Sequence, residues 1–260
     1  MQKYPSNEER TQKYLENFNR EKTLKYLIDK QDVVIFDIGA NIGSTALEFK
    51  QWWPKSQIHC FEPQTECLTD LNKVKDQYPL GEIIINNKAL GKEANGNAIF
   101  YTHDISSGLS GFNKINPSSL DSIELAKLSH LSNAQQESYL KSINNVRNVQ
   151  LMRLDDYIHK HNIVHIDLLK IDTQGHEPEV IEGLGEALSN VDVIVSELML
   201  YDYYERTLSF FDLEKLLIPA GFKLYDISHI AKNPMNGRTD WVDVIYVNER
   251  LRVKKNNAQK

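Results

Sequence analysis

Short apolar runs alternate along the chain with segments in which apolar and polar positions follow a helical period. Five of these runs, at 33–37, 58–62, 83–86, 168–172 and 193–197, have the length and composition of strands buried on both faces. In the segments between them, apolar residues recur every three or four positions, which is typical of amphipathic helices. Strands that alternate with helices predict an α/β fold built on a mostly parallel sheet.

The C-terminal part breaks this alternation. The pattern predicts a helix over 210–220 that ends at Gly221, a residue type common where a helix stops. Two apolar segments follow at 222–227 and 241–247, with a loop at 229–240 and no helix between them. Successive strands of this kind are expected to form an antiparallel hairpin.

Three segments lie outside the pattern of core elements. Residues 1–30 mix apolar and charged positions and predict one or two helices, packed beside the first strand or partly over the ligand site. Residues 103–150 are rich in Ser and Asn and include a polar helical stretch at 120–131. A connection this long is usually functional, so we predict an insert on the substrate side rather than a passive surface excursion. Residues 251–260 form a polar tail, which leaves 31–250 as the main domain.

The first predicted strand leads directly into a loop with two glycines. Residues 33–45 read VVIFDIGANIGST, in which an acid ends the strand and Ser44 begins a helix. Gly39 and Gly43 allow the backbone to approach a ligand where a side chain would collide. The first N–H groups of the helix have no partner within it and suit an anionic group. The candidate contacts in this loop are Asp37, Gly39, Ala40, Asn41, Gly43 and Ser44.

The spacing of these residues distinguishes two kinds of nucleoside cofactor. A dinucleotide fingerprint, G-x-G-x-x-G, beginning at Gly39 would place glycines where Asn41 and Ser44 stand. The pattern D-x-G-x-x-x-G resembles instead that of class I methyltransferases, which bind S-adenosylmethionine. Glu62 ends the second strand, just before Pro63, and an acid there can accept hydrogen bonds from both ribose hydroxyls of an adenosine.

A longer resemblance covers about residues 32–200. The chain resembles FkbM-type methyltransferases in the order of its segments FDIGANIGSTALEF, HCFEP, NNKALG, RLDDYI, LLKIDTQGHEPEVIEGL and VIVSELML. The resemblance implies a Rossmann-like seven-stranded sheet, mostly parallel with one antiparallel strand near the C-terminus and helices on both faces. It also implies that Ala89 and Leu90 lie beside the adenine. The chain departs from that family at Gln174, where a Glu is usual, which bears on any role that needs a carboxylate there.

The same resemblance implies an activity. It points to an S-adenosylmethionine-dependent O-methyltransferase that acts on a sugar-like small molecule or a nucleotide-linked glycan precursor. A nitrogen acceptor, a lipid or peptide acceptor, and a protein that binds the cofactor without catalysis are the alternatives on this fold. A pseudoenzyme would tolerate loss of the acids that end the strands, and this chain keeps Asp37, Asp172 and Glu197.

Those acids lie at the predicted carboxyl edge of the sheet, outside which open α/β sheets bind their ligands. A sugar hydroxyl is a weak nucleophile, so a general base should accelerate its methylation roughly 10²–10⁴-fold. His176 is the first candidate, because it titrates near neutrality and opens the helix after Asp172, where the helix dipole favours the neutral ring. Asp172 is the other candidate base, or it orients the acceptor.

The role of Glu197 stays open between three possibilities. It can bind substrate, pair with a basic residue such as Lys170, or join Asp172 in holding a divalent ion that activates a diol. Two carboxylates are too few to define such a site, and the two cysteines lack the spacing of a metal site, so we predict no metal.

Composition narrows the range of partners. The formal net charge is −6, and the only short basic block is Lys254-Lys255, so the chain lacks the cationic footprint of a nucleic-acid enzyme. No apolar run approaches the length of a membrane span, and the first ten residues are too polar for a signal peptide. We therefore predict a cytoplasmic enzyme with a small-molecule acceptor, and the sequence leaves its oligomeric state open.

Overall fold

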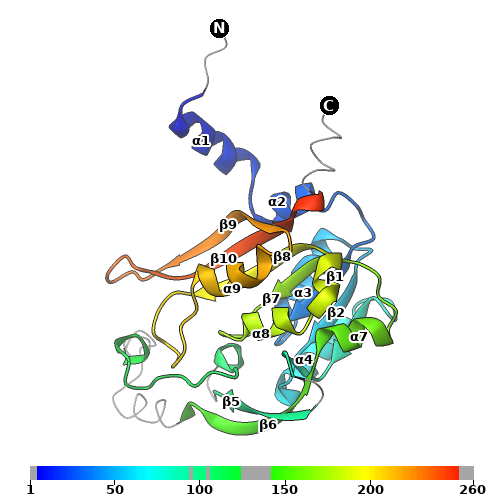
Figure 1. The fold of residues 1–260 in the computed structure, drawn as a ribbon, viewed down its shortest axis with the longest axis vertical. Helices are drawn as coiled ribbons and strands as arrows, with labels where there is room; N and C mark the ends of the chain where they lie inside the picture. Colours follow the sequence, from blue (N-terminus) through cyan, green and yellow to red (C-terminus); the bar gives the residue numbers. More distant parts are fainter. Residues whose placement is uncertain (1–4, 94–95, 104–105, 124–141, 252–260) are drawn as a thin grey trace.

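The computed structural model describes residues 5–93, 96–103, 106–123 and 142–251. A seven-stranded sheet forms its centre, in the order β3-β2-β1-β7-β8-β10-β9 (Figure 1). The strands are β1 (Val34–Ile38), β2 (Gln57–Phe61), β3 (Ile83–Asn86), β7 (Ile166–Ile171), β8 (Val191–Met199), β9 (Phe222–Lys232) and β10 (Thr239–Asn248). Strand β10 runs antiparallel to both of its neighbours, and the remaining pairs are parallel. The predicted Rossmann-like sheet with one antiparallel strand is confirmed.

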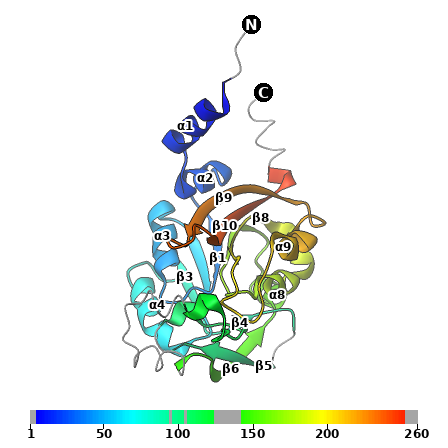
Figure 2. The same cartoon turned by 90° about the vertical axis from the view of Figure 1, so that its left-hand side faces the viewer.

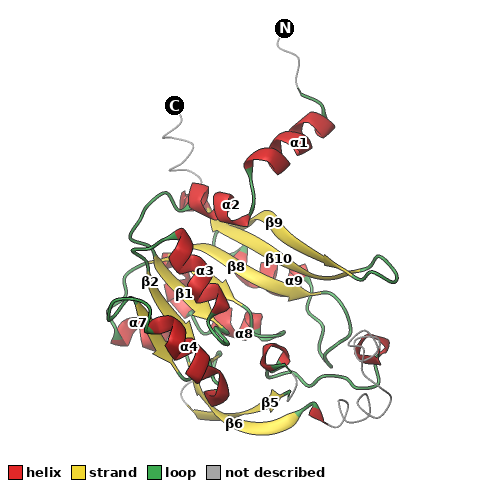
Figure 3. Cartoon of the chain, turned by 180° about the vertical axis from the view of Figure 1, so that it is seen from behind, coloured by secondary structure: helices red, strands yellow, loops and turns green. Residues whose placement is uncertain are grey.

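Helices cover both faces of this sheet, as the edge view in Figure 2 shows. One face, turned to the viewer in Figure 3, carries α2 (Arg20–Leu27), α3 (Ser44–Trp52) and α4 (Leu68–Lys75). The other carries α7 (Leu154–Lys160), α8 (Glu177–Glu182) and α9 (Phe210–Leu217). Neighbouring residues of one strand serve opposite faces, because Ile35 packs toward the first layer and Phe36 toward the second. Burial on both faces explains why these strands are continuous apolar runs.

A second sheet lies at the end of the molecule opposite the chain termini (Figure 1). It contains β4 (Ala89–Leu90), β5 (Gly96–Thr102) and β6 (Asn145–Met152), in the order β4-β6-β5. The sequence predicts β5 but assigns the start of β6 to the insert. That segment is polar and mostly exposed, so it lacks the apolar signal of a buried strand.

Three further predictions need adjustment. Helix α1 (Asn7–Asn17) buries none of its residues and projects from the domain, whereas α2 packs beside the first strand through Leu24 and Leu27 (Figure 1). The predicted loop at 229–240 is shorter, because β9 and β10 extend into it on a largely exposed edge. Of the polar helix at 120–131 only the first four residues are described, and they are helical. The rest of that helix, and all but the first residue of the polar tail, lie outside the described residues.

Candidate active site

The loop after β1 passes so close to the end of β7 that only glycine fits there. Gly39 has φ +77°, and a Cβ atom on it would lie 1.9 Å from the carbonyl oxygen of Asp172. The Asp172 N–H donates to the carbonyl oxygen of Ile38 at 3.0 Å, which fixes the two segments together. Gly43, with φ +90°, is the N-cap of α3 and has no side chain to cap the first N–H groups of that helix.

The carboxylate of Glu62 is held in place by backbone N–H groups. Its Oε2 accepts from the N–H of Asn41 at 2.9 Å, and its Oε1 accepts from the N–H of Gln64 at 2.8 Å. The residue is only 2% exposed. Burial raises the pKa of Glu62, and the two N–H donors oppose this by stabilising the charged form. The side chain is therefore oriented before any ligand binds.

A cavity joins this acid to the glycine loop and to the end of β7. The sequence-predicted cofactor residues on its wall are Gly39, Asn41, Glu62, Pro63, Ala89, Leu90 and Asp172. The other predicted cofactor residues, Asp37, Ala40, Gly43 and Ser44, are not on this wall. The cavity is also lined by residues outside the predicted cofactor set: Ile38, Phe61, Gln64, Lys88, Phe100, Ser107, Gly108, Ser110, Phe112, Thr173 and Gln174.

The insert contributes part of that wall. Ser107 donates its hydroxyl to Oδ1 of Asn41 at 2.9 Å, and its carbonyl oxygen accepts from Nε2 of Gln64 at 3.1 Å. These contacts attach the insert to both the glycine loop and the segment after Glu62. No motif in the sequence indicates these contacts, because they depend on tertiary packing of a Ser-rich segment.

A buried lysine lies beneath the loop. The ammonium of Lys170 is 3.3 Å from Oδ1 of Asp37 and 3.4 Å from Oδ2 of Asp172, and it donates to the carbonyl oxygen of Gly39 at 3.1 Å. Burial alone would lower the pKa of Lys170, but the two carboxylates raise it above its usual value. Lys170 therefore stays charged and pairs with Asp37 and Asp172, not with Glu197.

A second cavity, of about 150 Å³, shares Asp172 with the first. Its wall consists of Arg20, Thr45, Lys170, Ile171, Asp172, Val195, Glu197, Trp241 and Asp243. Arg20 of α2 lies 3.6 Å from Asp243, and within the described part of the chain its buried Nε has no hydrogen-bond partner. Sequence reasoning missed Arg20, Trp241 and Asp243, because they come from opposite ends of the chain and no spacing links them.

Gln174 connects the acids of the two cavities. Its Nε2 donates to Oδ1 of Asp172 at 2.8 Å and to Oε2 of Glu197 at 3.0 Å. Its Oε1 accepts from the hydroxyl of Tyr204 at 2.8 Å. Burial raises the pKa of Glu197 well above its usual value, and the neighbouring Asp172 raises it further. Two of the three predicted catalytic residues are thus brought together, with an amide between them.

The third predicted catalytic residue, His176, lines neither cavity. Its ring packs against Phe112 at a centroid distance of 4.2 Å, and its Nδ1 lies 3.6 Å from Glu179. Its Nε2 is buried without a hydrogen-bond partner among the described residues. Burial lowers the pKa of His176 to about 4, so the ring is neutral at neutral pH. The expected neutral form follows mainly from desolvation.

Comparison with known proteins identifies the family. The FkbM methyltransferase domain matches residues 37–224. The chain belongs to the FkbM methyltransferase family. Its match to the 2-O-methyltransferase NoeI of Sinorhizobium fredii is 30% identical over 191 residues and covers 70% of each chain. The hexuronic acid methyltransferase AglP of Haloferax volcanii is 24% identical over 169 residues, which cover 65% of this chain and 57% of that protein.

A solved FkbM methyltransferase has the same fold. The structure from Methylobacillus flagellatus KT aligns with a TM-score of 0.51 at 13% identity. The alignment covers 84% of this chain and 44% of that longer one. The family match ends before β9 is complete and begins after α2, so Arg20, Trp241 and Asp243 of this FkbM protein all lie outside it. Among the described helices, none is long and apolar enough to cross a bilayer.

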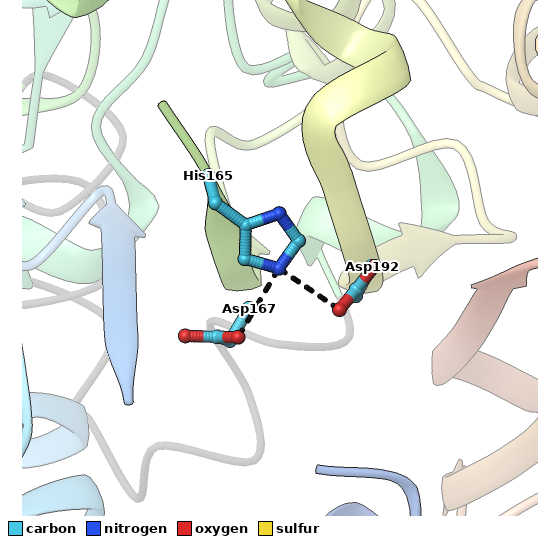
Figure 4. A group of neighbouring side chains, drawn as sticks. All are labelled: His165, Asp167 and Asp192. Carbon is cyan, nitrogen blue, oxygen red and sulfur yellow. Dashed lines mark hydrogen bonds and ion pairs between the residues drawn. The ribbon is translucent and has the colours of Figure 1, made fainter. Parts of the chain in front are cut away.

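One further group of side chains in this FkbM protein has the composition of a metal site. Nε2 of His165 lies 3.2 Å from Asp167 and 3.0 Å from Asp192 (Figure 4). Each acid also pairs with a cation: Lys30 lies 2.7 Å from Asp167, and Arg250 lies 3.0 Å from Asp192. The two acids stand near the first residues of β7 and β8, at the edge of the sheet opposite the cavities. Because protein cations already balance both acids, we assign this group to stability.

Proposed function

We propose that this protein is an S-adenosylmethionine-dependent O-methyltransferase whose acceptor is a hydroxyl of a sugar-like small molecule or a nucleotide-linked glycan precursor. The observation that carries the proposal is the fixed carboxylate of Glu62, which faces the same cavity as the Gly39 loop. An acid in that position recognises the paired hydroxyls of a ribose. The sugar acceptor is supported by the relatives, two of which are named as a 2-O-methyltransferase and a hexuronic acid methyltransferase.

The cavity walls suggest how each part of the cofactor is held. Ala89, Leu90 and Phe100 offer an apolar surface for the adenine. Glu62 binds the ribose, and the cationic sulfur lies toward Asp172, where both cavities meet. This arrangement directs the amino-acid end of the cofactor into the second cavity.

The second cavity suits a zwitterion, because it carries charges of both signs. Arg20 and the first turn of α3 at Thr45 suit the carboxylate of an amino acid. Asp243 suits its ammonium.

When bound, S-adenosylmethionine supplies a methyl group on a sulfonium for in-line displacement by the acceptor oxygen. The protein contributes position and a proton acceptor. We assign the role of accepting the hydroxyl proton to Asp172 rather than to His176, because Asp172 is on the wall of both cavities and His176 is on neither. Glu197 shares the amide of Gln174 with Asp172, so we assign it to binding of an acceptor hydroxyl.

Calorimetric titration tests the cofactor. We expect micromolar binding of S-adenosylmethionine and S-adenosylhomocysteine, and no binding of NAD. NAD binding as tight as that of the sulfur nucleosides would contradict the proposal. A screen of sugar nucleotides and matched amino sugars then tests the acceptor, because turnover of the amines alone would favour transfer to nitrogen.

A further inference from the structure

The amide of Gln174 occupies the point where two acidic side chains meet. One nitrogen atom, Nε2, lies 2.8 Å from Asp172 and 3.0 Å from Glu197. Two carboxyl groups that converge on one point need a proton, a cation or a shared donor between them. Here the shared donor is the primary amide, whose two N–H bonds serve one acid each.

The orientation of this amide follows from its other contacts. Its oxygen accepts from the hydroxyl of Tyr204, and a reversed amide would place that oxygen against both acids. The backbone is fixed as well, because the carbonyl oxygen of Gln174 accepts from Nδ2 of Asn113 at 3.0 Å. Gln174 has φ +57°, in the left-handed region that residues other than glycine rarely adopt. Surrounding contacts therefore hold a strained residue in a defined position at the junction of the two cavities.

A divalent cation would compete for the same place. Mg²⁺ and Mn²⁺ bind carboxylate oxygens at about 2.0–2.2 Å, and they need several oxygen ligands around one centre. Asp172 follows the last residue of β7, Glu197 lies on the neighbouring strand β8, and the side chain of residue 174 lies between their carboxylates. With glutamine there, the centre is filled by a neutral nitrogen donor, which cannot act as a ligand.

We propose that Gln174 is a positioning residue that holds Asp172 and Glu197 in their working arrangement without a divalent cation. This inference rests on the proposed methyl transfer, since it assigns the two acids to the acceptor side of that reaction. In this arrangement the amide fixes Oδ1 of Asp172, and Lys170 neutralises Oδ2 in part at 3.4 Å. The substitution Gln174→Glu replaces the donor by a third carboxylate of the same shape and should convert the point into a cation site.

The first test measures binding of Mn²⁺ alone to the full chain by electron paramagnetic resonance. The wild-type protein should show no Mn²⁺ binding that depends on Glu197, as judged against Glu197→Gln. Gln174→Glu should gain one Mn²⁺ with an affinity at least tenfold tighter than any wild-type binding. The double variant Gln174→Glu, Glu197→Gln should lose that gain. Comparison with Glu197→Gln also removes any contribution from the His165 group.

Two outcomes would overturn the inference. One is wild-type Mn²⁺ binding that disappears in Glu197→Gln, because the amide would then not exclude a cation. The other is a Gln174→Glu protein that binds S-adenosylhomocysteine like the wild type, and so is folded, yet gains no Mn²⁺. Gln174→Asp carries the same charge on a shorter side chain and is measured beside it in case the longer acid disturbs folding.

A wild-type measurement completes the design. The affinity for S-adenosylhomocysteine should change less than twofold between excess EDTA and millimolar Mg²⁺. A tenfold increase with Mg²⁺ would overturn the role of Gln174. Absence of S-adenosylhomocysteine binding under both conditions would instead contradict the proposed function, so the two failures are distinguishable.

Discussion

Glu62 reaches its working orientation through two backbone N–H groups rather than through the ligand. Binding therefore does not have to order this side chain, and its hydrogen bonds to a ribose are charge-assisted. We expect Glu62→Ala to weaken binding of S-adenosylhomocysteine more than tenfold, since bonds of this kind contribute about 1.5–3 kcal/mol. Calorimetry provides the measurement, with Glu66→Ala, an exposed acid nearby, as the matched control. Equal affinity in both variants would rule out the ribose assignment.

His176 should affect stability in a pH-dependent manner. Its pKa is lowered from 6.5 to about 4 by burial, so protons bind the unfolded chain more readily than the folded one. The stability that the neutral ring provides is fully present above pH 6.5 and is lost as the pH falls toward 4. The loss amounts to roughly 3 kcal/mol. Urea unfolding between pH 7.5 and 4.5 should show a steeper decline for the wild type than for His176→Phe, which keeps a ring against Phe112.

Parallel decline of the two proteins would show that the ring is accessible to protons in the folded state. The same variant separates stability from binding. Because His176 is on the wall of neither cavity, His176→Phe should retain wild-type affinity for S-adenosylhomocysteine at pH 7.5.

At the scale of elements, α2 brings Arg20 to a cavity built otherwise by strand ends and the start of α3. If Arg20 binds the carboxylate of the cofactor, Arg20→Ala should weaken the binding of S-adenosylhomocysteine about tenfold or more. The affinity of this variant for 5′-methylthioadenosine, which lacks the amino-acid end, should stay within twofold of the wild-type value. Lys22→Ala, an exposed cation on the same helix, controls for overall charge. Equal losses for both ligands would place the effect of Arg20 on the fold rather than on the amino-acid end.

The elements also show where sequence reasoning succeeds. Strands with both faces covered, such as β1 and β7, carry a continuous apolar signal and were predictable to within about two residues. Strand β6 was missed because most of its side chains are exposed, and β9 was predicted too short for the same reason. Glu62 was found because its distance from the glycine loop is fixed by one βαβ unit. Arg20, Trp241 and Asp243 of the second cavity were not found, since only the fold brings residue 20 beside residue 243.

At the scale of the whole molecule, the two edges of the large sheet have different roles. At the carboxyl edge, Glu62 after β2, Asp172 after β7 and Glu197 on β8 face cavities, and the last two acids share the amide of Gln174. The opposite edge carries acids that protein cations already balance, as at Asp167 and Asp192. Recognition is therefore concentrated at one edge. Of the two N-terminal helices, α2 contributes both to the core and to the second cavity, whereas α1 contributes buried residues to neither.

That division predicts a domain boundary inside the N-terminal segment. Helix α1 buries no residue, whereas α2 places Leu24 and Leu27 in the core and Arg20 at the second cavity. Deletion of residues 1–17 should leave the melting temperature within about 2 °C and the affinity for S-adenosylhomocysteine unchanged. Deletion of residues 1–28 should abolish cooperative unfolding, since losing even one buried leucine side chain costs about 2–5 kcal/mol.

Thermal unfolding followed by circular dichroism, with calorimetry for the ligand, measures both effects. Leu24→Ala in the full chain is the milder comparison and should lower the melting temperature without changing affinity, because Leu24 does not line either cavity. If the shorter deletion already unfolds the domain, α1 contributes contacts that its exposure does not reveal. If the longer deletion keeps both stability and affinity, α2 is not part of the catalytic domain, and the carboxylate of the cofactor is bound without Arg20.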